Sequence, residues 1–206
     1  MTKKLNVLLA EDQAMVRGAL AALLSLAMDD TIAMTVTEVE NGDQAMQQLK
    51  QQEFDLLLTD IEMPGKTGLE LCQYLQQQAS PTKTIILTTF GRSGYIKRAL
   101  EFGVGGFLLK DAPSDDLIHA INQVMAGKRV IDPELAISAI GDEDPLNDKE
   151  RKALRLAGEG KSTNEIAQLL FIAEGTVRNY LSEAIAKLNA TNRIDAARIA
   201  RQKGWL

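Results

Sequence analysis

The chain has 206 residues, of which 45% are hydrophobic, and a formal net charge of -5. This length accommodates one large or two modest domains with packed cores. Cys72 is the single cysteine, which excludes a disulfide framework and a thiolate metal site. No apolar stretch approaches the roughly 20 residues of a membrane span, and the first residues lead directly into a strand pattern. We therefore expect a soluble, cytoplasmic protein with no membrane insertion.

Strand and helix patterns alternate over the first 130 residues. Apolar runs predict strands near residues 5–10, 34–39, 55–59, 84–88 and 106–109, and helical periodicity follows each of them. Repeated units of this kind predict an α/β domain with a doubly wound, five-stranded parallel sheet of the flavodoxin-like type. We assign residues 1–127 to this domain and residues 128–145 to a linker, in which the pattern allows a short helix ending at Ile140.

Polar side chains follow four of the five predicted strands. In chain order they are Glu11 and Asp12, then Asp60, then Thr88 and Thr89, and finally Lys110. The carboxyl ends of parallel strands meet at one edge of a sheet, so these groups are expected to lie together. Carboxylates can hold Mg²⁺, while a lysine and a hydroxyl can hold phosphoryl oxygens. The pattern predicts magnesium-assisted phosphoryl transfer onto the carboxylate of Asp60.

The last 61 residues differ in charge and in pattern. Residues 1–145 contain 12 Lys and Arg against 21 Asp and Glu, whereas residues 146–206 contain 11 against 7. A basic segment suits a polyanion, and an acidic one suits a divalent metal ion. We assign residues 146–206 to an all-α domain with helices near residues 147–158, 162–170, 174–188 and 192–203.

The second and third of these helices form a candidate helix-turn-helix. Arg178, Asn179 and Ser182 lie opposite the apolar stripe of the third helix, and Arg and Asn can each bind a base in the major groove with two hydrogen bonds. The start of this helix, with Thr176, suits a phosphate. The predicted DNA-contacting residues are Lys161, Thr163, Thr176, Arg178, Asn179, Ser182, Lys187 and Arg193. Alternatively, these polar residues are only solvated on a helical interaction domain.

Two stretches of the chain resemble known families. Residues 5–126 resemble a receiver domain of two-component signalling, on the segments Leu8–Asp12, Thr59–Gly65, Leu87–Thr89 and Leu108–Asp111. Residues 146–206 resemble the LuxR-type DNA-binding domain of the NarL/FixJ response regulators, on the segments Leu146–Arg151, Gly160–Ala167, Gly175–Tyr180, Lys187–Leu188 and Asn192–Ala197.

The first resemblance implies a role for each residue at the sheet edge. It implies that Asp60 accepts phosphate from a sensor histidine kinase. It also implies a magnesium site formed by Glu11, Asp12, Asp60 and the main-chain carbonyl of Glu62. The residues that the resemblance places near the phosphoryl group, or in the switch that responds to it, are Thr88, Thr89, Lys110 and Phe107.

The two resemblances together imply a transcriptional regulator that is not an enzyme beyond self-phosphorylation and self-dephosphorylation. Its expected partners are the kinase, double-stranded promoter DNA, RNA polymerase and, on phosphorylation, a second copy of the chain. Candidate dimer residues are Ala22, Leu26, Ile118 and Met125, although these could equally fill the domain core. A surface on the fourth helix and fifth strand stays open as the alternative. A membrane-lipid desaturase gene is one candidate target, and another pathway is the alternative.

Two other classes of protein also stay open. A phosphatase of the haloacid-dehalogenase kind also uses an aspartyl nucleophile with Mg²⁺, but it would place Asp-x-Asp after its first strand, where this chain has Glu11-Asp12. A receiver that binds DNA without phosphorylation is the second alternative. Such a protein usually lacks one of the key polar residues, and here all five positions are filled.

Overall fold

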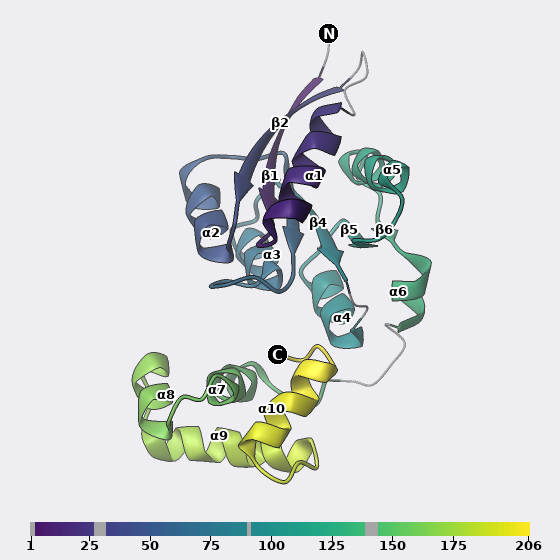
Figure 1. Ribbon diagram of the computed structural model, residues 1–206. Coiled ribbons are helices and arrows are strands. Elements are labelled where there is room, and N and C mark those ends of the chain that lie inside the picture. Colours follow the sequence, from purple (N-terminus) through teal and green to yellow (C-terminus); the bar gives the residue numbers. More distant parts are fainter. Residues whose placement is uncertain (1–2, 27–31, 90–91, 139–143) are drawn as a thin grey trace. The chain divides into compact units, whose positions relative to one another are not determined.

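The computed structural model describes residues 3–26, 32–89, 92–138 and 144–206 (Figure 1). These residues divide into two compact units, which consist mainly of residues 3–138 and of residues 144–206. The first unit is α/β, and the second is helical. Within the described ranges, no helix is long and apolar enough to cross a lipid bilayer.

The α/β unit is built on a parallel sheet. Its strands are β1 (Lys3–Ala10), β2 (Ile32–Val39), β3 (Leu56–Asp60), β4 (Lys83–Thr88), β5 (Gly106–Leu109) and β6 (Val130–Ile131). They lie in the order β2-β1-β3-β4-β5-β6, and every neighbouring pair is parallel. The five predicted strands are confirmed, with ends that agree within two residues.

The sheet has six strands where the sequence predicted five. The additional strand, β6, lies inside the segment predicted to be a linker. The amide of Val130 donates to the carbonyl of Gly105 at 2.9 Å, and that of Asp132 donates to the carbonyl of Phe107 at 3.0 Å. A strand of two residues is too short to show an alternating pattern, so periodicity could not reveal it. A short helix, α6 (Pro133–Ser138), follows, and its predicted end at Ile140 lies outside the described residues.

Helices cover both faces of the sheet. Before α6 they are α1 (Ala14–Leu26), α2 (Gly42–Gln51), α3 (Gly68–Gln77), α4 (Ser93–Glu101) and α5 (Ser114–Met125). Alternate residues of β1 point to opposite faces, because side chains alternate along a strand. Val7 and Leu9 pack with α1 and α5, whereas Leu8 and Ala10 pack with α2 and α3. Apolar groups thus fill both faces of the sheet, and the buried carboxylates Glu11 and Asp60 lie at the ends of β1 and β3.

The helical unit contains the four helices expected from the sequence. They are α7 (Asp148–Gly158), α8 (Thr163–Leu170), α9 (Glu174–Lys187) and α10 (Arg193–Gln202). Side chains cap three of their N-termini: Asn147 caps α7, Ser162 caps α8 and Asn192 caps α10. Such caps satisfy amide groups that have no partner inside a helix. No side-chain hydrogen bond caps α9, which follows Ala173.

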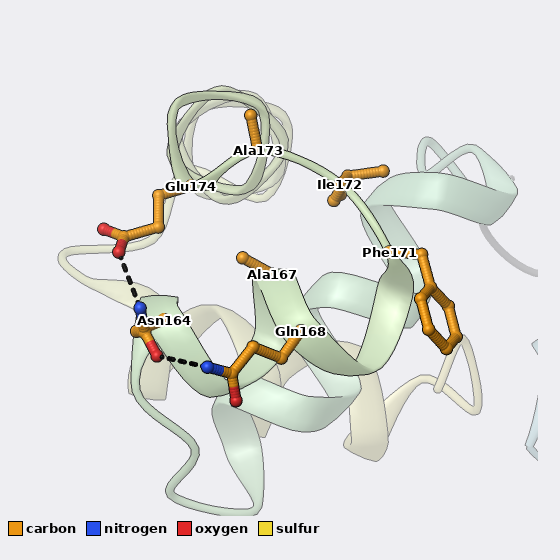
Figure 2. Close-up of a pocket in the computed structure, with 7 residues that line it drawn as sticks. All are labelled: Asn164, Ala167, Gln168, Phe171, Ile172, Ala173 and Glu174. Atoms are coloured by element: carbon orange, nitrogen blue, oxygen red, sulfur yellow. Dashed lines mark hydrogen bonds between the residues drawn. The ribbon is translucent and has the colours of Figure 1, made fainter.

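The turn between α8 and α9 contains a left-handed residue. Phe171 has φ 55° and ψ 45°, and the next amide, of Ile172, donates to the carbonyl of Ala167 at 3.0 Å. The turn and the two helices line a shallow groove, and Figure 2 shows the ring of Phe171 directed away from Asn164 and Glu174. Asn164 donates to the carboxylate of Glu174 at 2.9 Å, which ties α8 to the start of α9.

Candidate functional site

A lysine just after β5 contacts carboxylates from two other strand ends. Nζ of Lys110 lies 2.7 Å from Oε2 of Glu11 and 2.7 Å from Oδ2 of Asp60. The amide of Lys110 donates to the carbonyl of Thr88 at 2.8 Å, which fixes the lysine to the end of β4. The side chain of Lys110 is only 8% exposed, so the ion pairs are largely shielded from water.

Asp60 ends β3 and makes contacts through both of its carboxylate oxygens. Oδ2 faces Lys110, while Oδ1 accepts a hydrogen bond from the amide of Ile61 at 2.6 Å. The loop that follows returns closely to this point, because the amide of Gly68 donates to the carbonyl of Ile61 at 3.0 Å. A Cβ at Gly68 would lie 2.0 Å from the carbonyl oxygen of Asp60, so only glycine fits there without a shift of the backbone.

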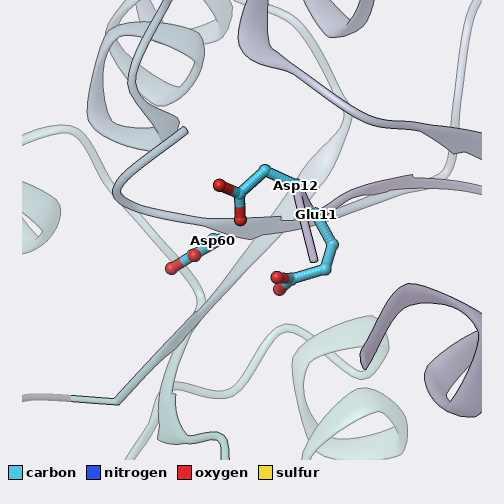
Figure 3. A group of neighbouring side chains, drawn as sticks. All are labelled: Glu11, Asp12 and Asp60. Carbon is cyan, nitrogen blue, oxygen red and sulfur yellow. The ribbon is translucent and has the colours of Figure 1, made fainter. Parts of the chain in front are cut away.

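Three carboxylates gather at this edge of the sheet. Oxygens of Glu11, Asp12 and Asp60 lie within 4.8 Å of one another (Figure 3). In the described part of the chain, Lys110 is the one cation in direct contact with these carboxylates, so the cluster carries excess negative charge. An all-oxygen donor set with excess negative charge fits a hard divalent cation such as Mg²⁺, which typically uses a few carboxylates and retains several waters.

Burial and neighbouring charges have opposite effects on the pKa values of Asp60, Glu11 and Lys110. Burial raises the pKa of the Asp60 carboxyl, and the ion pair with Lys110 only partly offsets this effect. Burial likewise raises the pKa of the Glu11 carboxyl against the same lysine. For Lys110, burial favours the neutral amine, but the hydrogen bonds to Asp60 and Glu11 outweigh it and raise the pKa. The lysine therefore stays charged, while the two carboxylates remain incompletely neutralised.

The other residues predicted at this site differ in their exposure. Thr88 is buried at the end of β4, whereas the neighbouring Thr89 is exposed. Glu62, whose carbonyl was expected to join the metal ligands, lies two residues after Asp60 and is exposed. Phe107 is 2% exposed within β5, so its ring is in the inward position.

The sequence did not reveal how the end of β1 is held. Nη1 of Arg17, on α1, donates to the carbonyl of Glu11 at 2.7 Å. Nε of Arg17 also lies 3.7 Å from a carboxylate oxygen of Glu38 on β2. Arg17 thus joins two strand ends beside the carboxylate cluster. Its position in the first turn of a helix carries no sequence signal for this contact.

In the helical unit, the residues predicted to read bases lie on the open face of α9. Arg178, Asn179 and Ser182 are exposed. The guanidinium of Arg178 lies 3.9 Å from the carboxylate of Glu174, one turn earlier on the same helix. An exposed pair of this kind is weak, so the arginine can exchange it for a base or a phosphate.

The predicted contacts to the DNA backbone fall into two groups. The first group is half-buried at the starts of helices. Its members are Lys161 and Thr163 at α8, Thr176 in the first turn of α9, and Arg193 at α10. Lys187 instead pairs with Glu150 of α7, whose two carboxylate oxygens both lie 2.8 Å from Nζ. Glu150 is fully buried, and sequence reasoning missed it as a partner. Its only signal was its place three residues after Asn147, which is the spacing of a capping box.

Matches to known families cover both units. Residues 7–122 match the response regulator receiver domain. Residues 144–200 match the luxR family of bacterial regulatory proteins. The matched ranges contain the carboxylate cluster and the helix-turn-helix, respectively.

Similar proteins align with the chain over almost its whole length. The chain is 46% identical to the uncharacterized transcriptional regulatory protein YvfU of Bacillus subtilis, covering 98% of this chain and 100% of YvfU. It is also 46% identical to the transcriptional regulatory protein DesR of the same organism, with 98% of each chain covered. Among solved structures, RcsB from Salmonella enterica serovar Typhimurium, bound to a promoter with the phosphomimetic BeF3-, is 26% identical and has a TM-score of 0.70. That match covers 96% of this chain and 98% of RcsB.

The carboxylate cluster, the helix-turn-helix and the extent of these similarities lead to one assignment. The chain belongs to the NarL/FixJ family of two-component response regulators, which join a receiver domain to a LuxR-type DNA-binding domain and regulate transcription.

Proposed function

We propose that Asp60 accepts a phosphoryl group from the phosphohistidine of a sensor histidine kinase, and that phosphorylation promotes dimerisation and promoter binding. The observation that carries the proposal is the buried Asp60 carboxylate, which lies in a cluster of three carboxylates and contacts Lys110. In the transfer, an oxygen of Asp60 forms a bond to phosphorus while the bond between phosphorus and the histidine nitrogen breaks. The neutral imidazole leaves with a proton taken from solvent.

The chain's own residues prepare this step. Glu11, Asp12, Asp60 and the carbonyl of Glu62 would hold Mg²⁺, which offsets the charge of the incoming phosphoryl group. Lys110 already contacts Asp60 and can transfer its hydrogen bonds to a phosphoryl oxygen. The hydroxyl of Thr88 lies at the end of the adjacent strand and can hold another oxygen. A shift of these two residues toward the phosphoryl group would alter the packing around Phe107.

Intact-protein mass spectrometry tests the transfer. Incubation with acetyl phosphate and Mg²⁺ is expected to add about 80 Da, the mass of one phosphoryl group. Asp60→Asn should show no adduct, whereas Asp111→Asn, which alters an exposed carboxylate beside Lys110, should still show it. Absence of the adduct from the wild-type chain would leave a regulator that binds DNA without phosphorylation. Multiple turnover of a small phosphate ester would favour the phosphatase alternative.

An exposed stripe on α1 supports a homodimer surface. Met15 and Leu26 are 88% and 82% exposed, and the exposed Ala19 and Ala22 lie between them on the same face of the helix. Exposed large apolar groups aligned in this way are typical of interaction surfaces. The predicted partners on α5 differ, because Ile118 and Met125 are half-buried and pack against the core. We therefore place α1 at the centre of the proposed interface.

A charge on this stripe should separate dimerisation from phosphorylation. Leu26→Glu is expected to accept the phosphoryl group normally but to remain monomeric in analytical ultracentrifugation. Ser25→Glu, on the neighbouring exposed position, serves as the control. A phosphorylated dimer in Leu26→Glu would move the interface to the other candidate, α4 and β5.

Promoter DNA is the proposed ligand of α9, supported by the exposed Arg178, Asn179 and Ser182. RNA polymerase is the proposed partner at the promoter, and a membrane-lipid desaturase gene is a proposed target. Selection of genomic DNA fragments with the phosphorylated protein tests the target directly. Recovery of promoters that exclude any lipid gene would assign the regulator to another pathway.

A further inference from the structure

An ion pair between an exposed lysine and a buried carboxylate holds the C-terminal end of α9. Lys187 is the last residue of this helix, and its Nζ lies 2.8 Å from each carboxylate oxygen of Glu150, in the first turn of α7. The side chain of Glu150 is 0% exposed and that of Lys187 is 37% exposed. The pair joins two helices that are distant in sequence and pack against each other.

The same carboxylate also closes the start of α7. Oε2 of Glu150 accepts from the amide of Asn147 at 2.9 Å, while Oδ1 of Asn147 accepts from the amide of Glu150 at 2.9 Å. Burial alone would raise the pKa of the Glu150 carboxyl, but hydrogen bonds with Lys187, with the amide of Asn147 and with the side chain of Glu183 hold it below its usual value. Glu150 is therefore a buried anion at neutral pH, and Lys187 is the cation that contacts it.

We propose that Lys187 is a positioning residue, which acts through Glu150 to set the orientation of α9 and does not neutralise a DNA phosphate. If Lys187 moved to a phosphate, it would leave the buried charge of Glu150 without compensation, which is costly. This inference revises the sequence-based prediction that Lys187 contacts the DNA backbone. It rests on the proposed role of α9 as the recognition helix. Lys161, which forms no ion pair with a buried carboxylate in the described part of the chain, keeps the role of a backbone contact.

The salt dependence of DNA binding distinguishes the two roles. The logarithm of the DNA-binding constant falls linearly with the logarithm of the salt concentration, and each lost phosphate contact reduces the steepness of that line by about 0.9. Binding is measured with the full-length phosphorylated protein, a DNA fragment selected by the wild type, and KCl varied over a fourfold range. Lys161→Met should show the reduced slope, whereas Lys187→Met should keep the wild-type slope and bind more weakly at every salt concentration. A slope reduced equally in both variants would overturn the proposal.

A second substitution tests whether Lys187 acts through Glu150. Gln can replace Glu in a capping box, so Glu150→Gln removes the buried charge and keeps the cap. Lys187→Met should lower the Tm of the helical unit by more than about 5 °C. The double variant Glu150→Gln/Lys187→Met should recover most of that loss and of the DNA affinity, whereas a lost phosphate contact could not be recovered in this way. Failure of the double variant to recover either quantity would refute the positioning role.

The two proposals can fail separately. If the phosphorylated wild type selects no DNA fragment, the proposed role of α9 fails, while the Tm values of the variants still test the ion pair. If Lys187→Met alone is too unstable to assay, the slope is measured in the double variant, which lacks the same ammonium group. A wild-type slope there supports the positioning role, and a reduced slope overturns it.

Discussion

Each unit of the molecule contains a lysine paired with a buried carboxylate, but the two pairs differ in charge balance. In the receiver, Lys110 faces the three carboxylates of the cluster, two of which it contacts directly. In the DNA-binding unit, Lys187 faces Glu150, which also serves as a helix cap. Lys187 contacts one carboxylate, which has the carboxyl of Glu183 beside it, whereas the receiver cluster gathers three carboxylates and still favours a further cation. The same pair of residue types therefore makes a reactive site in one unit and a structural contact in the other.

The largest expected difference between substitutions in the two units is in phosphoryl uptake. Asp60→Asn should abolish phosphoryl uptake completely, because no other carboxylate in the cluster is placed at the end of β3. Glu150→Gln should leave uptake unchanged. Phosphate-affinity electrophoresis after treatment with acetyl phosphate measures both. Uptake that persists in Asp60→Asn would show that another carboxylate is the acceptor.

Magnesium should separate the two lysines. Lys110→Met and Lys187→Met are each expected to lower the free energy of unfolding by about 2–3 kcal/mol in metal-free buffer, because each leaves buried negative charge unpaired. Excess Mg²⁺ should restore much of the loss in Lys110→Met, since the carboxylates released from the lysine can bind the ion. It should restore nothing in Lys187→Met. Urea unfolding with and without Mg²⁺ provides the measurement, and equal responses would contradict the difference in charge balance.

A smaller effect is expected from the cap that shares Glu150. Asn147→Ala should destabilise the helical unit by about 1 kcal/mol, because the amides of Lys149 and Glu150 lose their acceptor. Lys149→Ala, at an exposed position in the same turn, should change stability by less than about 0.5 kcal/mol. Thermal unfolding followed by circular dichroism compares the two. A neutral Asn147→Ala would show that the ion pair alone holds the start of α7.

The smallest effect is a difference in the sign of the pH dependence. The pKa of Asp60 is raised by burial, so the folded state holds a proton at pH values above the usual 3.8, and stability should rise as pH falls toward that value. The pKa of Glu150 is lowered by its hydrogen bonds despite burial, so its contribution should be lost as pH falls below the usual 4.5. The pH dependence of hydrogen exchange is measured in β3 and in α9. Comparing the wild type with Asp60→Asn and with Glu150→Gln separates the contribution of Asp60 from that of Glu150. If stability changed with pH in the same direction in both units, the opposite pKa shifts of Asp60 and Glu150 would be contradicted.

The sequence predicted the elements and the strand-end residues well, because both depend on local patterns. Asp60 and Lys110 could be placed at one sheet edge once the strands were recognised as parallel. The partner of Lys187 could not be found in this way, because the contact with Glu150 depends on how α7 and α9 pack. Strand β6 was missed for a related reason, since it exists only through pairing with β5.

Gly68 limits how the loop after Asp60 can vary. The chain leaves β3, turns, and returns so that Gly68 bonds to Ile61 and touches the carbonyl of Asp60. This closure fixes the number of residues in the turn, in which Glu62, Pro64 and Lys66 are exposed whereas Ile61 and Met63 are buried. Homologous regulators are thus expected to vary the exposed side chains of this segment while keeping its buried residues and tolerating no insertion or deletion. Engineers who alter the lifetime of the phosphoryl group should accordingly exchange only the exposed side chains here and keep the loop length constant.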